Sequence, residues 1–203
     1  DMNWMKKVAV ALVCLLPLGL QAAKVDTLQV KSPSMNKSIE VVVVSPDMAA
    51  TEACPVIYLL HGYGGNARTW VGIKPDLPKI ADEKGIFFVC PDGKNTWYWD
   101  SPLNADVRYE TFISDELVKY VDSHYKTVAD RKGRAITGLS MGGHGAMWNG
   151  LRHSDVFSAA GSTSGGVDIR PFPKNWEMSV QIGEKAKYPE NWEKYTVINL
   201  VPT

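Results

Sequence analysis

Runs of apolar residues, separated by segments with helical spacing, are the main pattern along this chain. The runs at residues 56–60 and 86–90 are apolar throughout, as expected of strands that are covered on both faces of a sheet. Residues 25–30 alternate between polar and apolar instead, which is typical of a strand with one exposed face. In total the sequence predicts strands at residues 25–30, 39–44, 56–60, 86–90, 134–137 and 157–160, the last of them buried.

Helical spacing fills the gaps between several of these strands. Residues 77–84 predict a short helix, and apolar side chains recur at helical spacing from Tyr109 to His124, with charged residues on the opposite face. Another helix is expected from Gly143. Strands that alternate with helices form a mostly parallel sheet with helices on both faces, and the first two strands would form its antiparallel edge. From Gly165 onward the chain is rich in Pro, Trp and Gly, which fits a lid, a pocket wall or a plain surface loop.

The pentapeptide Gly138-Leu139-Ser140-Met141-Gly142 lies between a predicted strand and a predicted helix. G-x-S-x-G on such a turn is the nucleophile elbow of an α/β-hydrolase, the fold class that we expect here. The turn lifts the Ser140 hydroxyl above the sheet and leaves the backbone N–H of Met141 free to stabilise an oxyanion. Residues two before and two after the serine must lack side chains, because strand and helix approach closely there. A Gly/Ser-rich turn without chemistry is the alternative interpretation.

A second motif, His61-Gly62-Tyr63-Gly64-Gly65, directly follows the predicted strand at residues 56–60. A Gly-rich turn at this place can direct backbone N–H groups to the same point as the Met141 amide, and acyl transfer needs two such donors. A flexible turn, with His61 hydrogen-bonded at the strand end, is the alternative. The order of the two motifs matches the mechanics of the α/β-hydrolase fold and favours an oxyanion hole.

The first 22 residues have the pattern of a secretory signal peptide. Met5-Lys6-Lys7 gives a positive start, an apolar run follows from Val8 to Leu20, and Gln21-Ala22-Ala23 offers small residues for cleavage. That run is too short to span a bilayer comfortably, and no later segment could do so. We therefore expect residues 1–22 to be removed. Residues 23–203 would form one α/β-hydrolase domain, secreted or periplasmic and away from the membrane after cleavage.

Charge and composition narrow the class of partner. The 22 basic and 22 acidic residues balance, with no long run of either sign, so nucleic acid is excluded as a partner and a small or neutral one is favoured. The histidines and cysteines show no metal-ligand spacing, so we expect neither a metal nor another cofactor. Cys54 and Cys90 lie at opposite ends of neighbouring predicted strands, about 15 Å apart, which predicts two buried free thiols. The oligomeric state stays open.

Four segments together resemble a known family. They are His61 to Gly65, Pro91-Asp92-Gly93, Trp97 to Pro102, and the nine residues from Gly138 to Ala146. Over residues 38–170 the chain is similar to the esterase D-like esterases, a family that includes feruloyl and acetylxylan esterases, S-formylglutathione hydrolases and mycobacterial mycolyltransferases.

The resemblance implies roles for particular residues. It implies that Ser140 is the nucleophile and that the backbone N–H groups of Tyr63 and Met141 form the oxyanion hole. It also implies that Trp97 and Tyr98 lie beside the substrate. The expected substrate is a small-molecule or polysaccharide ester. Secretion and the tryptophan-rich loop favour acyl groups, feruloyl or acetyl, on plant polysaccharide.

The sequence offers no well-placed base for Ser140. His144 lies one helical turn beyond the serine and is interpreted as a packed or capping residue, while His124 and His153 end helices, where a cation suits the helix dipole. In this fold the triad follows the order Ser, Asp/Glu, His, with the acid and the histidine after later strands than the six predicted here. Asp168, after the sixth strand, is an alternative position for the acid.

We therefore expect a sequence truncated at its C-terminus, whose natural reading frame continues past Thr203 to an acid and then a histidine. The 203-residue form would be impaired in catalysis for that reason. The residues are also compatible with two other functions. One is a non-catalytic carbohydrate-binding protein on an esterase scaffold, and the other is an acyltransferase in which a sugar hydroxyl replaces water.

Overall fold

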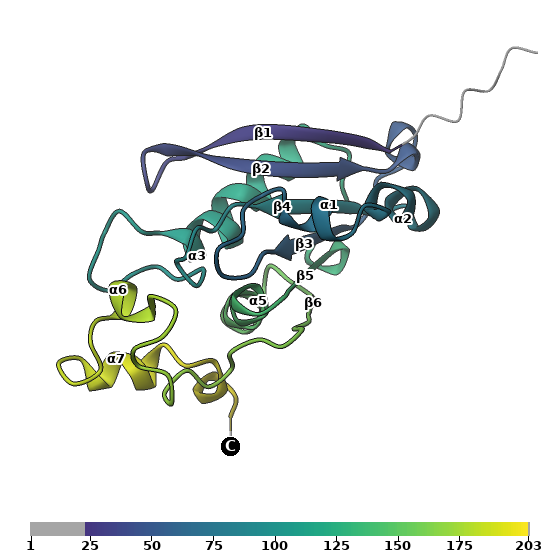
Figure 1. Ribbon diagram of the computed structural model, residues 1–203. Coiled ribbons are helices and arrows are strands. Elements are labelled where there is room, and N and C mark those ends of the chain that lie inside the picture. Colours follow the sequence, from purple (N-terminus) through teal and green to yellow (C-terminus); the bar gives the residue numbers. More distant parts are fainter. Residues whose placement is uncertain (1–22, 203) are drawn as a thin grey trace, which may run out of the picture.

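A six-stranded sheet with the strand order β1-β2-β4-β3-β5-β6 forms the centre of the computed structural model, which describes residues 23–202 (Figure 1). β1 (Lys24–Ser32) and β2 (Lys37–Ser45) form an antiparallel hairpin, and β2 pairs antiparallel with β4 (Phe87–Pro91). β3 (Val56–Leu60) is parallel to β4 and to β5 (Arg134–Gly138). The mostly parallel sheet with an antiparallel edge is confirmed. The expected signal segment, residues 1–22, lies outside the described residues.

The sixth strand differs from the prediction. A buried strand was expected over residues 157–160, whereas β6 is the two-residue strand Ala159–Ala160 and both of its residues are exposed. Phe157 is buried outside the strand, where its ring packs edge-on against Tyr58 with 5.7 Å between the ring centres. The apolar residue that suggested a buried strand therefore fills the core beneath the sheet. β6 pairs only with β5 among the described residues.

Helices cover both faces of the sheet, as expected. α1 (Thr69–Ile73) and α2 (Leu77–Lys84) pack against one face, over side chains of β2, β3 and β4. α5 (Met141–Arg152) packs against the other face, beneath β3 and β5 (Figure 1). Three of the largest fully buried side chains, Trp99, Trp148 and Trp192, lie in the core on the α5 side. The two apolar faces of the sheet are therefore both buried, which explains its continuous apolar runs.

The predicted amphipathic helix from Tyr109 to His124 consists of three consecutive pieces. They are α3 (Tyr109–Thr111), a π-helical segment (Phe112–Leu117) and α4 (Val118–His124). The buried carboxylate of Glu110 ties this helix to α5, because it accepts hydrogen bonds from Trp148 Nε1 at 2.6 Å and lies 2.9 Å from His153 Nε2. This contact fixes the C-terminal end of α5 (Met141–Arg152), the helix that follows Ser140.

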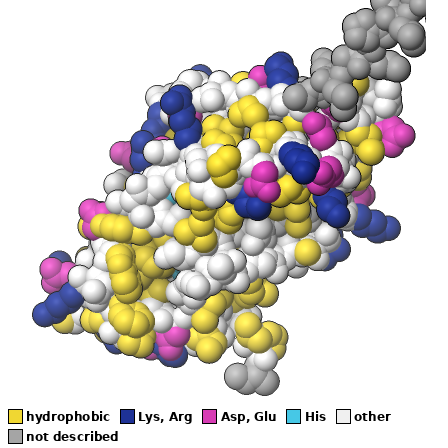
Figure 2. Space-filling model, turned by 45° about the vertical axis from the view of Figure 1, so that its right-hand side comes forward, with side chains coloured by type: hydrophobic (Ala, Val, Ile, Leu, Met, Phe, Trp, Pro, Cys, Tyr) yellow, Lys and Arg dark blue, Asp and Glu magenta, His cyan; other side chains and the backbone are white. Residues whose placement is uncertain are grey.

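The chain beyond residue 165 forms an irregular segment that includes α6 (Met178–Ile182) and α7 (Pro189–Lys194) and lies to the left of α5 and below it in Figure 1. Apolar side chains gather on the surface at the level of this segment in Figure 2, in agreement with the exposure of Phe172, Trp176 and Val180. Among the described residues no helix is both long enough and apolar enough to cross a membrane.

Cys54 and Cys90 are both buried and free, as predicted. Burial raises the pKa of the Cys90 thiol to about 12. A thiol in this state stays protonated at neutral pH and is unreactive, so it contributes to packing only.

Candidate active site

Ser140 occupies a strained position at the junction of β5 and α5. Its backbone has φ 53° and ψ −118°, a combination that costs a non-glycine residue about 1–3 kcal/mol. The neighbouring chain enforces it, because the Ser140 N–H donates to the carbonyl of Thr163 at 2.8 Å and the Ser140 carbonyl accepts from the N–H of His144 at 3.0 Å. The side chain of Ser140 is exposed. Strain held at an exposed nucleophilic residue is typical of a functional turn.

Two glycines allow this turn to pack against β3. A Cβ atom at Gly142 would lie 2.1 Å from the carbonyl oxygen of Leu60, and one at Gly138 would lie 2.4 Å from the backbone of Gly142. Real Cβ atoms essentially never approach so closely. The close approach of strand and helix, which the sequence motif predicts, is present, and only glycine fits at both positions.

The Gly-rich turn after β3 lies directly against this elbow. A Cβ atom at Gly62 would lie 2.9 Å from the Leu139 side chain and 3.5 Å from that of Ser140. The next two N–H groups beyond Tyr63 have acceptors, since Gly64 donates to Asn95 Oδ1 at 2.9 Å and Gly65 donates to the Gly62 carbonyl at 3.0 Å. Within residues 23–202 the Tyr63 N–H has no hydrogen-bond acceptor.

Met141 provides a second available donor beside Ser140. It is the first residue of α5, and the first N–H groups of a helix have no partner within the helix. The same end of the helix carries the positive pole of its dipole, which favours negative charge. The elbow and the Gly-rich turn thus bring two backbone donors to the surroundings of one serine.

A pocket of about 140 Å³ adjoins Ser140. Aromatic side chains form much of its wall, and it combines residues of the two predicted motifs with residues of the irregular C-terminal segment. The lining residues are Tyr63, Trp97, Ser140, Ser164, Gly166, Asp168, Ile169, Phe172, Trp176 and Met178. The structure therefore brings Ser140, Tyr63 and Trp97 together at one pocket. Sequence reasoning did not single out Phe172, Trp176 and Met178 as pocket residues. The only signal was the density of Trp and Pro in that segment, which is compatible with a pocket wall.

Tyr98 occupies a different place from the one expected. It is fully buried and does not line the pocket; its hydroxyl donates to the carbonyl of His61 at 2.8 Å. Its ring also packs beneath the elbow helix, because a Cβ atom at Gly145 would lie 2.3 Å from it. Tyr98 therefore supports the Gly-rich turn and α5 from below, and the prediction that it lies beside the substrate is corrected.

Glu177 connects the C-terminal segment to the Gly-rich turn. Its carboxylate accepts hydrogen bonds from Tyr63 Oη at 2.8 Å and from Asn95 Nδ2 at 3.0 Å, and Asn95 in turn accepts from the Gly64 N–H. The hydrogen bond to Glu177 raises the pKa of the Tyr63 hydroxyl. Glu177 and its neighbour Trp176 both have positive φ angles, 55° and 52°. This strained pair of residues is thus tied to the Gly-rich turn through Tyr63 and to the segment after β4 through Asn95.

We expect Glu177→Ala to loosen the Gly-rich turn without unfolding the domain. Loss of the carboxylate removes the acceptor shared by Tyr63 and Asn95, so hydrogen exchange at the Gly64 amide should rise by about fivefold. Hydrogen–deuterium exchange with mass spectrometry measures this directly. Glu177→Gln keeps one carbonyl oxygen as an acceptor and should give a smaller rise. Equal exchange in all three proteins would show that Glu177 does not hold the turn.

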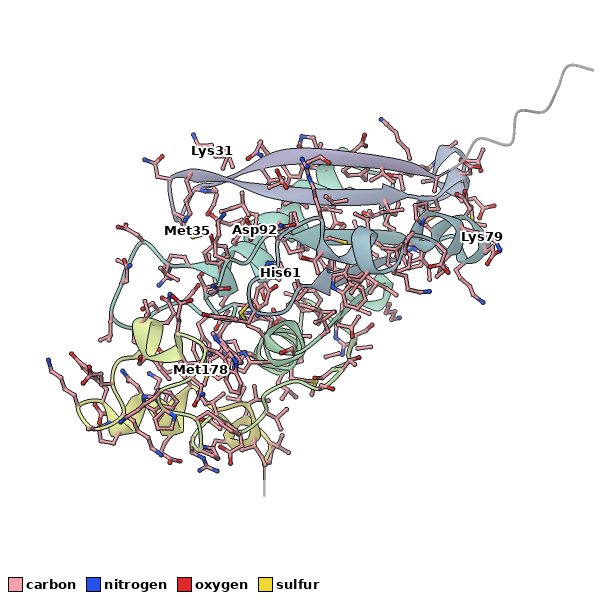
Figure 3. All side chains as sticks on the ribbon, in the orientation of Figure 1. Lys31, Met35, His61, Lys79, Asp92 and Met178 are labelled. Carbon is pink, nitrogen blue, oxygen red and sulfur yellow. The ribbon has the colours of Figure 1, made fainter. Side chains whose placement is uncertain are left out.

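His61 is a buried structural partner of the Gly-rich turn. Its Nδ1 lies 2.7 Å from the Gly62 carbonyl and must donate, because a carbonyl only accepts; its Nε2 accepts from the Gly93 N–H at 2.9 Å. The carboxylate of Asp92 lies 3.3 Å from the same Nε2 (Figure 3). Burial acts to raise the pKa of Asp92, but its contact with the His61 ring and the hydrogen bonds from the Lys94 N–H and ammonium groups outweigh burial and lower that pKa to about 2.

The other histidines are also engaged away from the Ser140 hydroxyl. His144 is fully buried, and its ring lies edge-on to Trp97 and Trp99 with 5.1 and 4.9 Å between ring centres. Burial lowers its pKa to about 3, only partly opposed by the Trp97 backbone. His153 contacts Glu110, and His124 Nδ1 lies 2.8 Å from the Tyr120 carbonyl. The packed His144 agrees with its interpretation from sequence.

Asp168 lines the Ser140 pocket, but its carboxylate is bound to Arg170. The two side chains form a pair of hydrogen bonds at 2.8 and 3.0 Å, and the hydrogen bond from Arg170 is the main cause that lowers the pKa of Asp168. A carboxylate engaged in this way is not oriented toward any of the four histidines. Among the described residues no group of histidine, cysteine and acidic side chains has the arrangement of a metal site.

The fold, the strained serine and the glycine packing around it define an α/β-hydrolase. The chain belongs to the Putative esterase family, whose model matches residues 32–201.

Three known proteins illustrate this similarity. Esterase Rv1288 of Mycobacterium tuberculosis is 30% identical over 149 residues, which cover 70% of this chain and 32% of that protein. A solved ferulic acid esterase is 29% identical with a TM-score of 0.69, over 86% of this chain and 71% of the other. An S-formylglutathione hydrolase from Agrobacterium tumefaciens shares the fold with a TM-score of 0.74. The two sequences are 23% identical, and the match covers 88% of this chain and 70% of the other. The chain thus spans about a third of the length of the mycobacterial relative.

Proposed function

We propose that the protein is a serine esterase that hydrolyses carboxylic esters through Ser140. The observation that carries this proposal is the exposed, strained serine in an aromatic pocket, beside two backbone N–H donors that have no acceptor within residues 23–202. Membership of an esterase family supports the same reaction class.

The geometry fits the steps of acyl transfer. Ser140 Oγ attacks the ester carbonyl carbon while a base takes its proton, and the resulting oxyanion receives hydrogen bonds from the Tyr63 and Met141 N–H groups. The intermediate collapses, the C–O bond to the alcohol breaks and the alcohol receives the proton from the base. Water then repeats the sequence on the acyl-enzyme and releases the acid. Each well-placed oxyanion donor is worth about 3–4 kcal/mol of barrier.

The base and its orienting acid are proposed to come from sequence outside residues 23–202. The four histidines within these residues are bound to other partners or packed among aromatic rings, and Asp168 is held by Arg170. The 203-residue chain should therefore be severely impaired, because a serine without its base loses most of its catalytic advantage. Protein expressed from the complete reading frame should be much faster in the same assay.

The pocket supports an aromatic or small acyl group. Tyr63, Phe172 and Trp176 expose their rings around Ser140, and aromatic faces bind aromatic ligands by stacking. The similarity to a ferulic acid esterase points in the same direction. We propose feruloyl or acetyl esters of plant polysaccharide as the substrate class, and a secreted or periplasmic location for an enzyme that meets such a polymer.

The acyl-enzyme provides the sharpest test of the reaction. Protein from the complete reading frame is mixed with an aryl acetate or methyl ferulate, quenched in acid within the first turnover and digested for peptide mass mapping. We expect the mass of the acyl group on the peptide that contains Ser140. Product formation without an adduct on that peptide, or binding of feruloyl-oligosaccharide without any product, would argue against the serine esterase. A sugar ester formed in the presence of a sugar acceptor would point to acyl transfer instead.

A further inference from the structure

A second and larger cavity, of about 510 Å³, opens at the same edge of the sheet as the Ser140 pocket. The Gly-rich turn separates the two, because Tyr63 lines the pocket and Asn66, three residues later, lines the cavity. The segment after β4 divides in the same way, with Asp92 and Lys94 on the cavity side and Trp97 on the pocket side. Figure 3 shows Asp92 beside His61 at this place, between the sheet and the segments that follow it.

The strand order gives the distance between the two hollows. Ser140 follows β5, whereas Glu40 lies in β2 at the cavity, and the Glu40 carbonyl accepts the Asp92 N–H at 2.9 Å. β2 is three strand positions away from β5, which corresponds to about 14 Å at the usual spacing of strands. A chain of sugar units bound along this edge would therefore reach from one hollow to the other.

The walls of the cavity carry charged groups of both signs. Lys94 Nζ lies 2.9 Å from the Asp92 carboxylate, and Arg68 Nε lies 3.5 Å from that of Glu40. Lys37 has no carboxylate partner among the described residues and lies over the ring of Tyr109, 5.4 Å from its centre. The cavity thus offers neighbouring hydrogen-bond donors and acceptors, together with the Lys37 ammonium group, which no carboxylate within residues 23–202 neutralises.

The hydroxyl of Tyr109 is an unsatisfied donor at this cavity. The residue is 1% exposed, it lines the cavity, and its Oη has no hydrogen-bond partner among the described residues. Burial, assisted by the charge of Asp92, raises its pKa to about 12, so the hydroxyl keeps its proton at neutral pH. A buried polar group without a partner has lost its hydration without compensation, and an oxygen of a bound molecule would restore a hydrogen bond to it.

We propose that this cavity is a subsite for a sugar unit on the alcohol side of the ester, with Tyr109 and Lys37 among its hydrogen-bond donors. The inference rests on the proposed esterase function, since it places the polymer that carries the ester bond. Sugar hydroxyls both donate and accept, which matches walls that hold lysine, arginine and carboxylate groups together. A polyphosphate or nucleic acid fits less well than a sugar, because Arg68 and Lys94 are already paired with Glu40 and Asp92. Lys37 additionally allows the sugar to carry a carboxylate.

Binding of ester-free oligosaccharides to the 203-residue chain tests this subsite without any turnover. Xylotetraose serves as the neutral probe and trigalacturonic acid as the acidic one, each titrated by isothermal calorimetry. Tyr109→Phe removes only the hydroxyl and Lys37→Gln removes only the charge. Each should weaken binding of at least one probe by about fivefold, the size expected for one hydrogen bond. Lys79→Gln, on α2 at the opposite end of the sheet in Figure 3, is the matched control and should bind as the unmodified chain does.

The outcomes separate the subsite from the esterase proposal. If Lys37→Gln weakens the binding of trigalacturonic acid alone, the subsite recognises a carboxylated sugar. If both probes lose affinity equally, the subsite recognises sugar hydroxyl groups. Either result supports the subsite. Binding that Tyr109→Phe and Lys37→Gln leave unchanged, in variants whose melting temperature matches that of the unmodified chain, would overturn it. So would the absence of saturable binding to both probes. An intact subsite in a protein that forms no acyl-enzyme would leave the subsite standing and remove the esterase.

Discussion

Ser140→Gly is expected to abolish ester hydrolysis while it raises the free energy of unfolding. In protein from the complete reading frame, loss of the proposed nucleophile should lower kcat by about 10⁴-fold or more, because the remaining oxyanion donors and pocket supply only a small part of the rate. The backbone of Ser140, at φ 53° and ψ −118°, is strained for any residue with a Cβ atom. Glycine relieves that strain at the expense of some chain entropy, so we expect a net gain of about 1 kcal/mol.

Ser140→Ala is the control that separates the two effects. Alanine also lacks the hydroxyl but keeps the Cβ atom, so it should be equally inactive and should unfold within about 0.5 kcal/mol of the unmodified protein. Hydrolysis of an aryl acetate and unfolding in urea measure the two quantities on the same samples. Hydrolysis that persists in either variant would exclude the serine mechanism. A glycine variant no more stable than the alanine variant would show that the elbow stores little strain.

Gly142→Ala is expected to destabilise the domain severely. The added methyl group would lie 2.1 Å from the Leu60 carbonyl oxygen and 2.7 Å from that of His61, where backbone atoms of β3 and the following turn cannot move aside. Overpacking in a well-packed interior costs about 1–3 kcal/mol, and this contact is with rigid backbone, so we expect a loss at or above the upper end of that range. Urea unfolding of the 203-residue chain, followed by circular dichroism, provides the measurement.

Gly72→Ala is a matched control for the same chemical change. Gly72 lies within α1, and a Cβ atom there would have nothing within 4 Å. Replacing glycine by alanine in a helix stabilises it by about 0.5–1 kcal/mol, so this variant should unfold at slightly higher urea. If the two variants behaved alike, the packing of the elbow against β3 would have no special importance.

Local patterns in the sequence predicted the parts of the molecule that depend on local geometry. The glycines around Ser140 follow from the steric demands of one turn, and the strand at Val56–Leu60 follows from an unbroken apolar run. The mostly parallel sheet follows from the alternation of strands and helices. These features need only neighbours along the chain, which is why periodicity and a short motif were sufficient.

Other parts of the site depend on contacts between distant segments. The hydrogen bond from Tyr63 to Glu177 joins residues 114 positions apart, and nothing near Glu177 in the sequence indicates its partner. Trp97 and Tyr98 are adjacent in the chain, yet one lines the pocket and the other is enclosed beneath the elbow. A motif places both residues near the site but does not say which of them turns inward. That choice is made by the glycines at positions 93 and 145, whose lack of side chains leaves room for the Tyr98 ring.

The packed imidazole of His144 should make the free energy of unfolding decrease at low pH. Its pKa is about 3 in the folded protein and about 6.5 in an unfolded chain, so between these values the unfolded state binds more protons. Stability is therefore full above pH 6.5 and falls by about 1.4 kcal/mol for each pH unit below it, until pH 3 is approached. Urea unfolding at pH 7.0, 6.0 and 5.0 should show this slope, and a His144→Phe variant that still folds should lack it. A residue one helical turn beyond the proposed nucleophile would then set the lowest pH at which the domain stays folded.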